Sequence, residues 1–271
     1  MVASIFVLNL AGCASSSLAS KMKAPSYKSL DDDSYVYLRI PVKSFSTLIK
    51  KAALEVTTAS EGDVNSLVKR IDEVYIGYGC NENPYRFEIV AEGNVPSIAF
   101  SSLKKQVYDG DFLKYTYYIE EKNNIEILKL NDRTFGIAKN TYPLVKNYEN
   151  SFLSENDEEE GYEWWFNQET DDGLFYIKKN DSALQGLLGI SLPLNYNAAY
   201  GRIIWNGGTT YALDINLSFK DSRVAKALET ALGYTARLLR INVKAIDDNT
   251  INISGFALEE SQIIDLLKMR N

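Results

Sequence analysis

The stretch Tyr211-Ala212-Leu213-Asp214-Ile215-Asn216-Leu217-Ser218-Phe219 decides the fold class. Large apolar residues alternate with small or polar ones, and this period of two predicts a β-strand that buries one face. The turn residues Asn206-Gly207-Gly208 come just before it and predict a hairpin with the preceding run, Arg202–Trp205. We therefore expect an antiparallel sheet with one face in the core.

The sequence pattern predicts the same order of strands and helices in both halves of the chain, β-α-β-β-α-β-β-α. The closest match between the halves is a pair of turns, Asn131-Asp132-Arg133 and Asp247-Asp248-Asn249, each set between two apolar runs. The first six elements have the order of the split βαβ unit. We expect an α+β fold of two tandem ferredoxin-like (βαββαβ-type) units, with antiparallel sheets covered by helices. One continuous α+β domain is the alternative.

The expected elements follow from hydrophobic periodicity and from turn and capping residues. We expect strands at residues 35–40, 74–78, 85–92, 125–130, 134–138, 174–177, 202–205, 209–219, 238–246 and 250–254. Helices are expected at residues 45–56 and 63–71, from Pro96, from Thr141, from Asp181 through 188, from residue 221 or 222 to Gly233, and at the C-terminus around 263–267.

The N-terminal residues resemble an export signal. A short apolar run, residues 2–10, leads into Leu10-Ala11-Gly12-Cys13, and a small-residue segment follows. This tetrapeptide resembles the lipobox of bacterial lipoproteins. The resemblance implies cleavage before Cys13, acylation of Cys13 with palmitate or a similar chain, and insertion of that chain into membrane lipid. No Lys or Arg precedes Lys21, which indicates a truncated signal peptide; a buried N-terminal strand with an ordinary cysteine is the alternative.

These features predict the domain organisation. We expect a lipoprotein signal peptide at 1–12, a flexible tether at 13–33, a first α+β domain at 34–150, an acidic linker at 151–172 and a second α+β domain at 173–271. The expected localisation is the cell envelope, lipid-anchored to the inner or outer membrane on the periplasmic side or at the cell surface.

Composition excludes several chemistries. The chain has 29 Lys and Arg against 36 Asp and Glu, a net charge of −7, so we expect no nucleic-acid partner. It has no histidine and only two cysteines, Cys13 and Cys80, which excludes Ser-His-Asp catalysis and His- or thiolate-ligated metals. We expect Cys80 to be a buried small hydrophobe. No cofactor is expected, and the acidic run Glu155–Glu160 fits a solvated linker better than a calcium loop.

The segment Tyr162-Glu163-Trp164-Trp165-Phe166 is the one unusual aromatic cluster. It is either a core strand that docks the second half or an exposed platform of the kind found at interfaces and sugar-binding surfaces. We take Tyr162, Trp164 and Trp165 as candidate contact residues.

Three function classes fit these observations. We expect a non-enzymatic, membrane-anchored envelope lipoprotein that binds a protein partner or a small ligand. One alternative is a carboxylate-based glycoside hydrolase, which needs two acidic groups across a cleft. The other is a structural envelope scaffold.

Overall fold

The computed structural model describes residues 25–56, 60–80, 86–152, 161–178, 196–261 and 263–264. The chain forms two compact units. A small unit takes in the chain up to Asp31 together with Glu88–Glu158, and a large unit takes in Asp32–Phe87 together with the chain from Glu159 onward.

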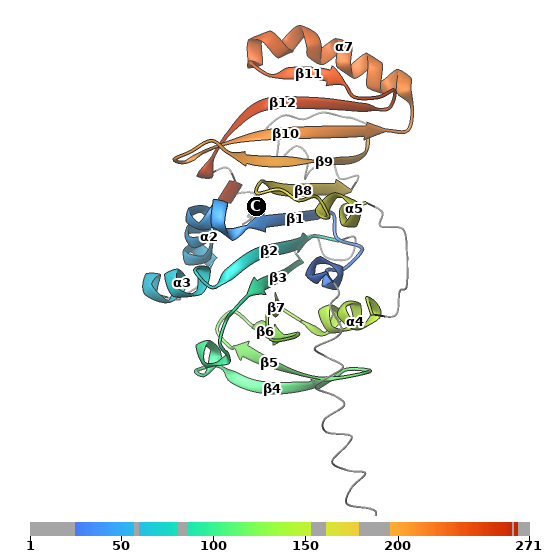
Figure 1. Cartoon of the computed structure of the whole chain (residues 1–271). Helices are drawn as coiled ribbons and strands as arrows, with labels where there is room; N and C mark the ends of the chain where they lie inside the picture. Colours follow the sequence, from blue (N-terminus) through green and yellow to red (C-terminus); the bar gives the residue numbers. More distant parts are fainter. Residues whose placement is uncertain are drawn as a thin grey trace, which may run out of the picture. The chain divides into compact units, whose positions relative to one another are not determined.

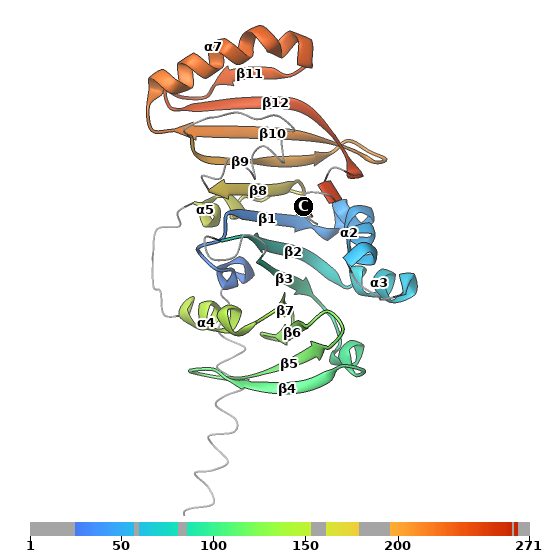
Figure 2. The same cartoon turned by 180° about the vertical axis from the view of Figure 1, so that it is seen from behind.

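The large unit is built on a run of antiparallel strands in the order β11-β12-β10-β9-β8-β1-β2. In both views α7 lies along β11, at the edge of this sheet (Figures 1 and 2). Its elements, in chain order, are β1 (Val36–Pro41), α2 (Val42–Val56), α3 (Glu61–Val68), β2 (Ile71–Tyr78), α5 (Tyr162–Phe166), β8 (Gly173–Lys178), β9 (Tyr196–Trp205), β10 (Thr210–Phe219), α7 (Ser222–Leu239), β11 (Asn242–Ala245) and β12 (Thr250–Glu259).

The core of the large unit lies on one face of this sheet. The alternate residues Leu213, Ile215 and Leu217 of β10 are fully buried there, as the alternation predicted. Helices α2 and α7 contribute apolar side chains to the same cluster, among them Phe45 and Leu228. The burial of each such side chain stabilises the fold by about 1.5–3 kcal/mol.

Helix α7 begins and ends for local reasons. The side chain of Asp221 accepts a hydrogen bond from the backbone N–H of Arg223 (2.9 Å) and so caps the helix. Arg240, with φ of 56°, adopts the left-handed conformation that ends it. The prediction that the helix ends at Gly233 is wrong, because the apolar stripe continues through Ala236, which is buried against the sheet.

The small unit has the strand order β3-β7-β6-β5-β4, with antiparallel neighbours. Its elements, in chain order, are η1 (Ser26–Ser29), β3 (Phe87–Gly93), η2 (Ser97–Phe100), β4 (Lys104–Asp109), β5 (Lys114–Glu120), β6 (Ile125–Lys129), β7 (Thr134–Ala138) and α4 (Tyr142–Asn150).

Residues expected to belong to the tether are packed into the small unit. Tyr27 and Leu30 are buried, and Asn147 of α4 donates a hydrogen bond to the Leu30 carbonyl (3.2 Å). The tether expected through residue 33 therefore ends before η1, because these two apolar side chains anchor the segment to α4.

The hairpin of β4 and β5 was not expected. Strand β4 carries mostly exposed side chains, so its sequence lacks an apolar alternation. A turn that begins at Asp109-Gly110-Asp111 connects the two strands. The buried carboxylate of Glu149 accepts the backbone N–H groups of Asp111, Phe112 and Leu113 at 2.7, 3.1 and 3.2 Å and so holds this turn.

The ferredoxin-like prediction is not confirmed. That unit pairs two of its strands in parallel through a crossover helix, whereas β1 pairs antiparallel with both of its neighbours, β2 and β8. Because β1 joins β8, the division into units also differs from the expected domains at 34–150 and 173–271.

The two matching turns nevertheless occupy comparable places. Asn131-Asp132-Arg133 connects β6 to β7, and β7 pairs with β3. Asp247-Asp248-Asn249 connects β11 to β12, and β12 pairs with β10. Internal duplication stays a prediction.

Several expectations fall outside the described residues. These are the signal peptide with Cys13, the first part of the tether, the acidic run Glu155–Glu160, the helix expected at 181–188 and the C-terminal helix beyond residue 264.

Candidate functional site

The second face of the large unit's sheet is polar, because the residues between the core positions of β10 point the other way. Their cross-strand partners on β9, β12 and β11 are polar too, and together they form two parallel rows. We call these eight residues the polar face. One row is Arg202, Asp214, Ser254 and Asn242, and the other is Tyr200, Asn216, Asn252 and Lys244.

Asn252 is the central hydrogen-bonding residue of the polar face. Its side-chain amide donates to the Asp214 carboxylate and to the Asn216 side-chain oxygen, the latter at 3.0 Å. Asn252 is 7% exposed, whereas Asp214 and Asn216 are partly open to solvent. Among the described residues, the Asn216 amide N–H groups meet no acceptor, so a ligand could take them.

Arg202 joins the polar face to the segment that follows α5. Its guanidinium donates to the Gln168 side chain at 3.0 Å and lies 3.7 Å from the Asp172 carboxylate. Its side chain is 40% exposed, so these contacts orient it while solvent still reaches it.

The short helix α5 is held on the same side of the sheet by Arg39 of β1. The Arg39 guanidinium donates to the carbonyls of Phe166 (3.0 Å) and Gln168 (2.6 Å), at the C-terminal end of α5. It also forms a two-point ion pair with Glu73 at 3.1 and 2.6 Å. Burial alone would lower the pKa of Arg39, but the hydrogen bonds and charge of Glu73 outweigh it and raise the pKa. Arg39 is therefore a permanent cation at the end of α5.

Aromatic contacts complete the support of α5. Tyr162 stacks on Tyr37, with ring centroids 3.8 Å apart and an interplanar angle of 7°. The Trp165 indole N–H donates to the Gly201 carbonyl at 3.1 Å. A Cβ at Gly201 would lie 1.9 Å from the backbone oxygen of Asp214, so this close approach requires glycine. Burial, followed by the nearby Asp32 charge, raises the pKa of Tyr162, which stays protonated.

The three candidate contact residues therefore separate. The prediction of a strand at Tyr162–Phe166 is wrong, because these residues form a helix, and a helix sends neighbouring side chains in different directions. Tyr162 and Trp165 are buried, at 4% and 6% exposure, whereas Trp164 is 53% exposed. The Trp164 ring lies 5.7 Å from Trp165 and 6.0 Å from Tyr200 of the polar face, measured between centroids.

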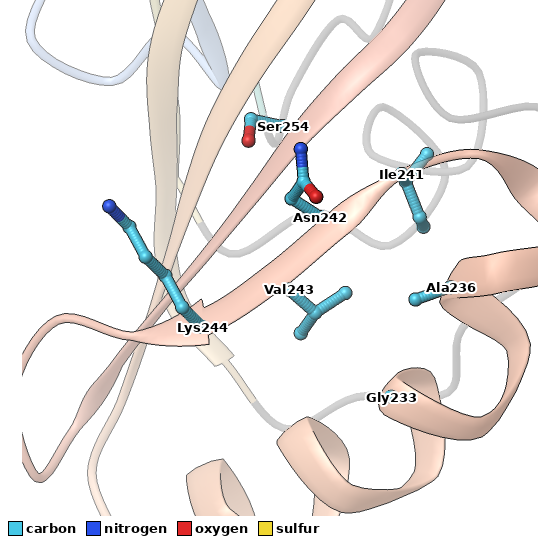
Figure 3. Close-up of a pocket in the computed structure, with 7 residues that line it drawn as sticks. All are labelled: Gly233, Ala236, Ile241, Asn242, Val243, Lys244 and Ser254. Carbon is cyan, nitrogen blue, oxygen red and sulfur yellow. The ribbon is translucent and has the colours of Figure 1, made fainter.

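A shallow pocket of about 590 Å³ lies at the other end of the polar face, between α7 and β11 (Figure 3). Gly233, Ala236, Ile241 and Val243 give it an apolar side, and Asn242, Lys244 and Ser254 of the polar face give it a polar one. Gly233 has no neighbour within 4 Å of where a Cβ would lie, so the helix leaves open space there.

The sequence pattern drew attention to Trp164, which stays a candidate contact residue, but not to most of the polar face. The alternation of β10 placed Asp214 and Asn216 opposite the core, whereas the partners Arg202, Asn252 and Ser254 depend on strand register, which the sequence pattern does not give. Cys80, as expected, is buried at 1% exposure. The Cys13 lipidation site lies outside the described residues.

The part of the chain that the structure describes contains no group of three or more Cys, Asp or Glu side chains arranged to hold a metal ion. None of the helices in this described part combines the length and the apolar character needed to cross a membrane.

Comparison with solved structures shows the same fold elsewhere. Crystal forms I and IV of TP0453 each align with a TM-score of 0.67 and 15% identity, over 92% of this chain and 98% of theirs. Crystal form III gives a TM-score of 0.67 and 14% identity, over 92% of this chain and 99% of its own. Among curated protein sequences none matches the chain.

A protein-family profile gives the assignment. The profile described as "Outer membrane-associated lipoprotein TP0453" matches residues 24–264, nearly all of the chain. This match confirms that the protein is a bacterial lipoprotein of the cell envelope, as the lipobox indicated. The chain belongs to the family of outer membrane-associated lipoproteins named after TP0453.

Proposed function

We propose that this lipoprotein has no enzymatic activity and binds a protein partner or a small ligand of the envelope through Trp164 and the polar face. Acylated Cys13 anchors it in membrane lipid. The observation that carries the proposal is the exposure of Trp164 on a helix whose other large aromatic residues are all buried.

The energetics of α5 favour a contact role for Trp164. An indole that is half exposed to water stabilises the fold by on the order of 2 kcal/mol less than a fully buried one. The helix beneath it is fixed by Arg39, by the Tyr162 stacking and by the Trp165 hydrogen bond. A rigid, exposed aromatic loses little conformational entropy on binding, which is why Trp is common at interface hot spots.

The same geometry favours binding over hydrolysis. A glycosidase needs a carboxylic acid whose pKa is raised so that it can donate a proton. Among the described residues, hydrogen bonds to Lys129 and Arg223 lower the pKa values of the Asp132 and Asp221 carboxyl groups respectively, which is the opposite of what a proton donor needs. On the polar face, the Asp214 carboxylate accepts a hydrogen bond from Asn252, which suits an acceptor for a ligand.

Photo-crosslinking in the native envelope tests the contact surface. A benzophenone-bearing aromatic residue replaces Trp164 in one strain and Trp205 in a control strain. Trp205 is 50% exposed but lies in the β9–β10 hairpin, so it matches Trp164 in exposure and differs in place. We expect a defined crosslinked product at position 164 and none at 205. Equal crosslinking at both positions, or none at 164, would contradict the proposal.

Fatty-acid labelling tests the anchor separately. The gene is expressed with its natural start in the presence of an alkyne-bearing palmitate analogue. We expect label on the wild-type protein and none on Cys13→Ser. Label that persists in Cys13→Ser would exclude anchoring through this residue.

A further inference from the structure

We infer that the ligand of the polar face is an uncharged oligosaccharide, with one pyranose ring against Trp164 and its hydroxyl groups bonded across β9, β10 and β12. The inference rests on the proposed function, because it names the ligand class of that same surface.

The spacing of the two polar rows matches an extended sugar chain. Adjacent strands lie about 4.8 Å apart, so successive side chains in a row are spaced at intervals comparable to one sugar residue. Asp214 and Ser254 lie directly opposite each other in one row, as do Asn216 and Asn252 in the other. Two parallel rows of this kind can follow an extended chain that crosses the strands.

The polar side chains of β10 and β12 can bond to the hydroxyl groups of a sugar. A sugar presents pairs of neighbouring hydroxyl groups, each both donor and acceptor. Asn216 offers its amide N–H groups, Asp214 offers carboxylate oxygens, and Ser254 offers a hydroxyl that can do either. From the neighbouring strand β12, the Asn252 amide donates hydrogen bonds to Asp214 and Asn216, so both are oriented before a ligand arrives.

The charges of the polar face lie apart from the proposed sugar contacts or are compensated. The Arg202 guanidinium lies 3.7 Å from Asp172, and Arg202 pairs across the strands with Asp214, so its charge is largely compensated. The other cation, Lys244, lies on β11 at the end of its row opposite Tyr200. The whole chain carries a net charge of −7, which repels polyanions. A neutral polyhydroxylated ligand complements this surface, whereas an anionic polymer does not.

Trp164 lies beside the polar face, where it can pack against a sugar ring. A pyranose ring has an apolar face of C–H groups that packs on a flat aromatic ring. Trp164 is 53% exposed and its ring lies 6.0 Å from that of Tyr200, the first residue of one polar row. An aromatic platform therefore adjoins the hydrogen-bonding rows.

An array of oligosaccharides tests the inference with the folded chain lacking residues before Cys13. The array holds neutral chains of three or more pyranose rings, in α and β linkages, with and without N-acetyl groups, and polyanionic heparin fragments as a contrast. Hits are then titrated by calorimetry against wild type, Trp164→Ala, Asn216→Ala and Trp205→Ala. Circular dichroism checks that each variant is folded.

We expect at least one neutral oligosaccharide to bind, with about tenfold or greater loss in Trp164→Ala and Asn216→Ala and no change in Trp205→Ala. The inference is overturned if no neutral oligosaccharide binds, if the heparin fragments bind best, or if Trp164→Ala binds as wild type does. A crosslink from position 164 to a protein, without sugar binding, would retain the proposed function and reject the oligosaccharide.

Discussion

The two faces of the large unit's sheet share strands but differ in what they bury. On one face Leu213, Ile215 and Leu217 are completely enclosed by α2, α7 and neighbouring strands. On the other face the intervening Asp214 and Asn216 stay partly open and are held in position by Asn252. Because successive side chains point to opposite faces, a single strand supplies fully buried apolar residues to the core and partly exposed polar residues to the second face.

The largest expected effect comes from Ile215→Ala on the core face. Ile215 is 0% exposed, so its truncation leaves a cavity and lowers the free energy of unfolding by about 2–5 kcal/mol. Asn216→Ala, one residue along, should cost about 1 kcal/mol, the worth of one hydrogen bond. Urea unfolding measures both. Equal losses of unfolding free energy at the two positions would contradict the assignment of one face to the core and of the other to the surface.

The next effect concerns the support of α5. Arg39→Met removes a guanidinium whose side chain is 13% exposed and leaves Glu73 without its partner, so we expect a loss of about 2–4 kcal/mol. Acrylamide should then quench Trp165 more strongly, because α5 loses the cap at its C-terminal end. Arg223→Met is the control: its pair with Asp221 is on the surface, at 88% exposure for Arg223, and its loss should leave the free energy of unfolding almost unchanged. Unchanged quenching in Arg39→Met would show that Arg39 does not position α5.

The sequence predicted the features that depend on local hydrophobic alternation, but not those that depend on long-range strand pairing. The alternation of β10 and its turn predicted the hairpin and its buried face, because burial acts directly on composition. The pairing of β1 with β8 joins residues far apart in the chain, and no local pattern specifies it. Periodicity also could not separate Trp164 from Trp165, since five residues are too few to distinguish a helix from a strand.

The buried tyrosines predict a dependence of stability on pH. Burial, followed by a nearby carboxylate, raises the pKa values of Tyr162 in the large unit and Tyr115 in the small unit above the ordinary 10.0. The folded state therefore favours the protonated phenols. This stabilisation is fully present below pH 10 and is lost as the pH rises further, because the tyrosines then ionise in the unfolded chain first.

We expect the free energy of unfolding to be level up to about pH 10 and to fall above it. Above pH 10, the free energy of unfolding should fall less steeply with pH in Tyr162→Phe and in Tyr115→Phe than in wild type. A slope in Tyr162→Phe and Tyr115→Phe as steep as that of wild type would contradict this assignment.

The smallest effect on stability is expected where the effect on function is largest. Trp164→Ala and Trp205→Ala remove side chains of similar exposure, 53% and 50%, so each should change the free energy of unfolding by about 1 kcal/mol. Of these two variants, only Trp164→Ala should weaken binding of the envelope ligand, by about tenfold or more. A loss of several kcal/mol in Trp164→Ala would make this residue part of the core.

The most direct test of the contact surface is ¹⁹F NMR of the protein labelled with 5-fluorotryptophan. The chain has three tryptophans, so three resonances are expected, and each is assigned by a Trp→Phe variant. The labelled protein is titrated with a detergent-solubilised envelope fraction of the producing cells. We expect the Trp164 resonance to shift or broaden while those of Trp165 and Trp205 stay in place. A Trp164 resonance that does not move, alongside a shift at Trp205, would contradict it.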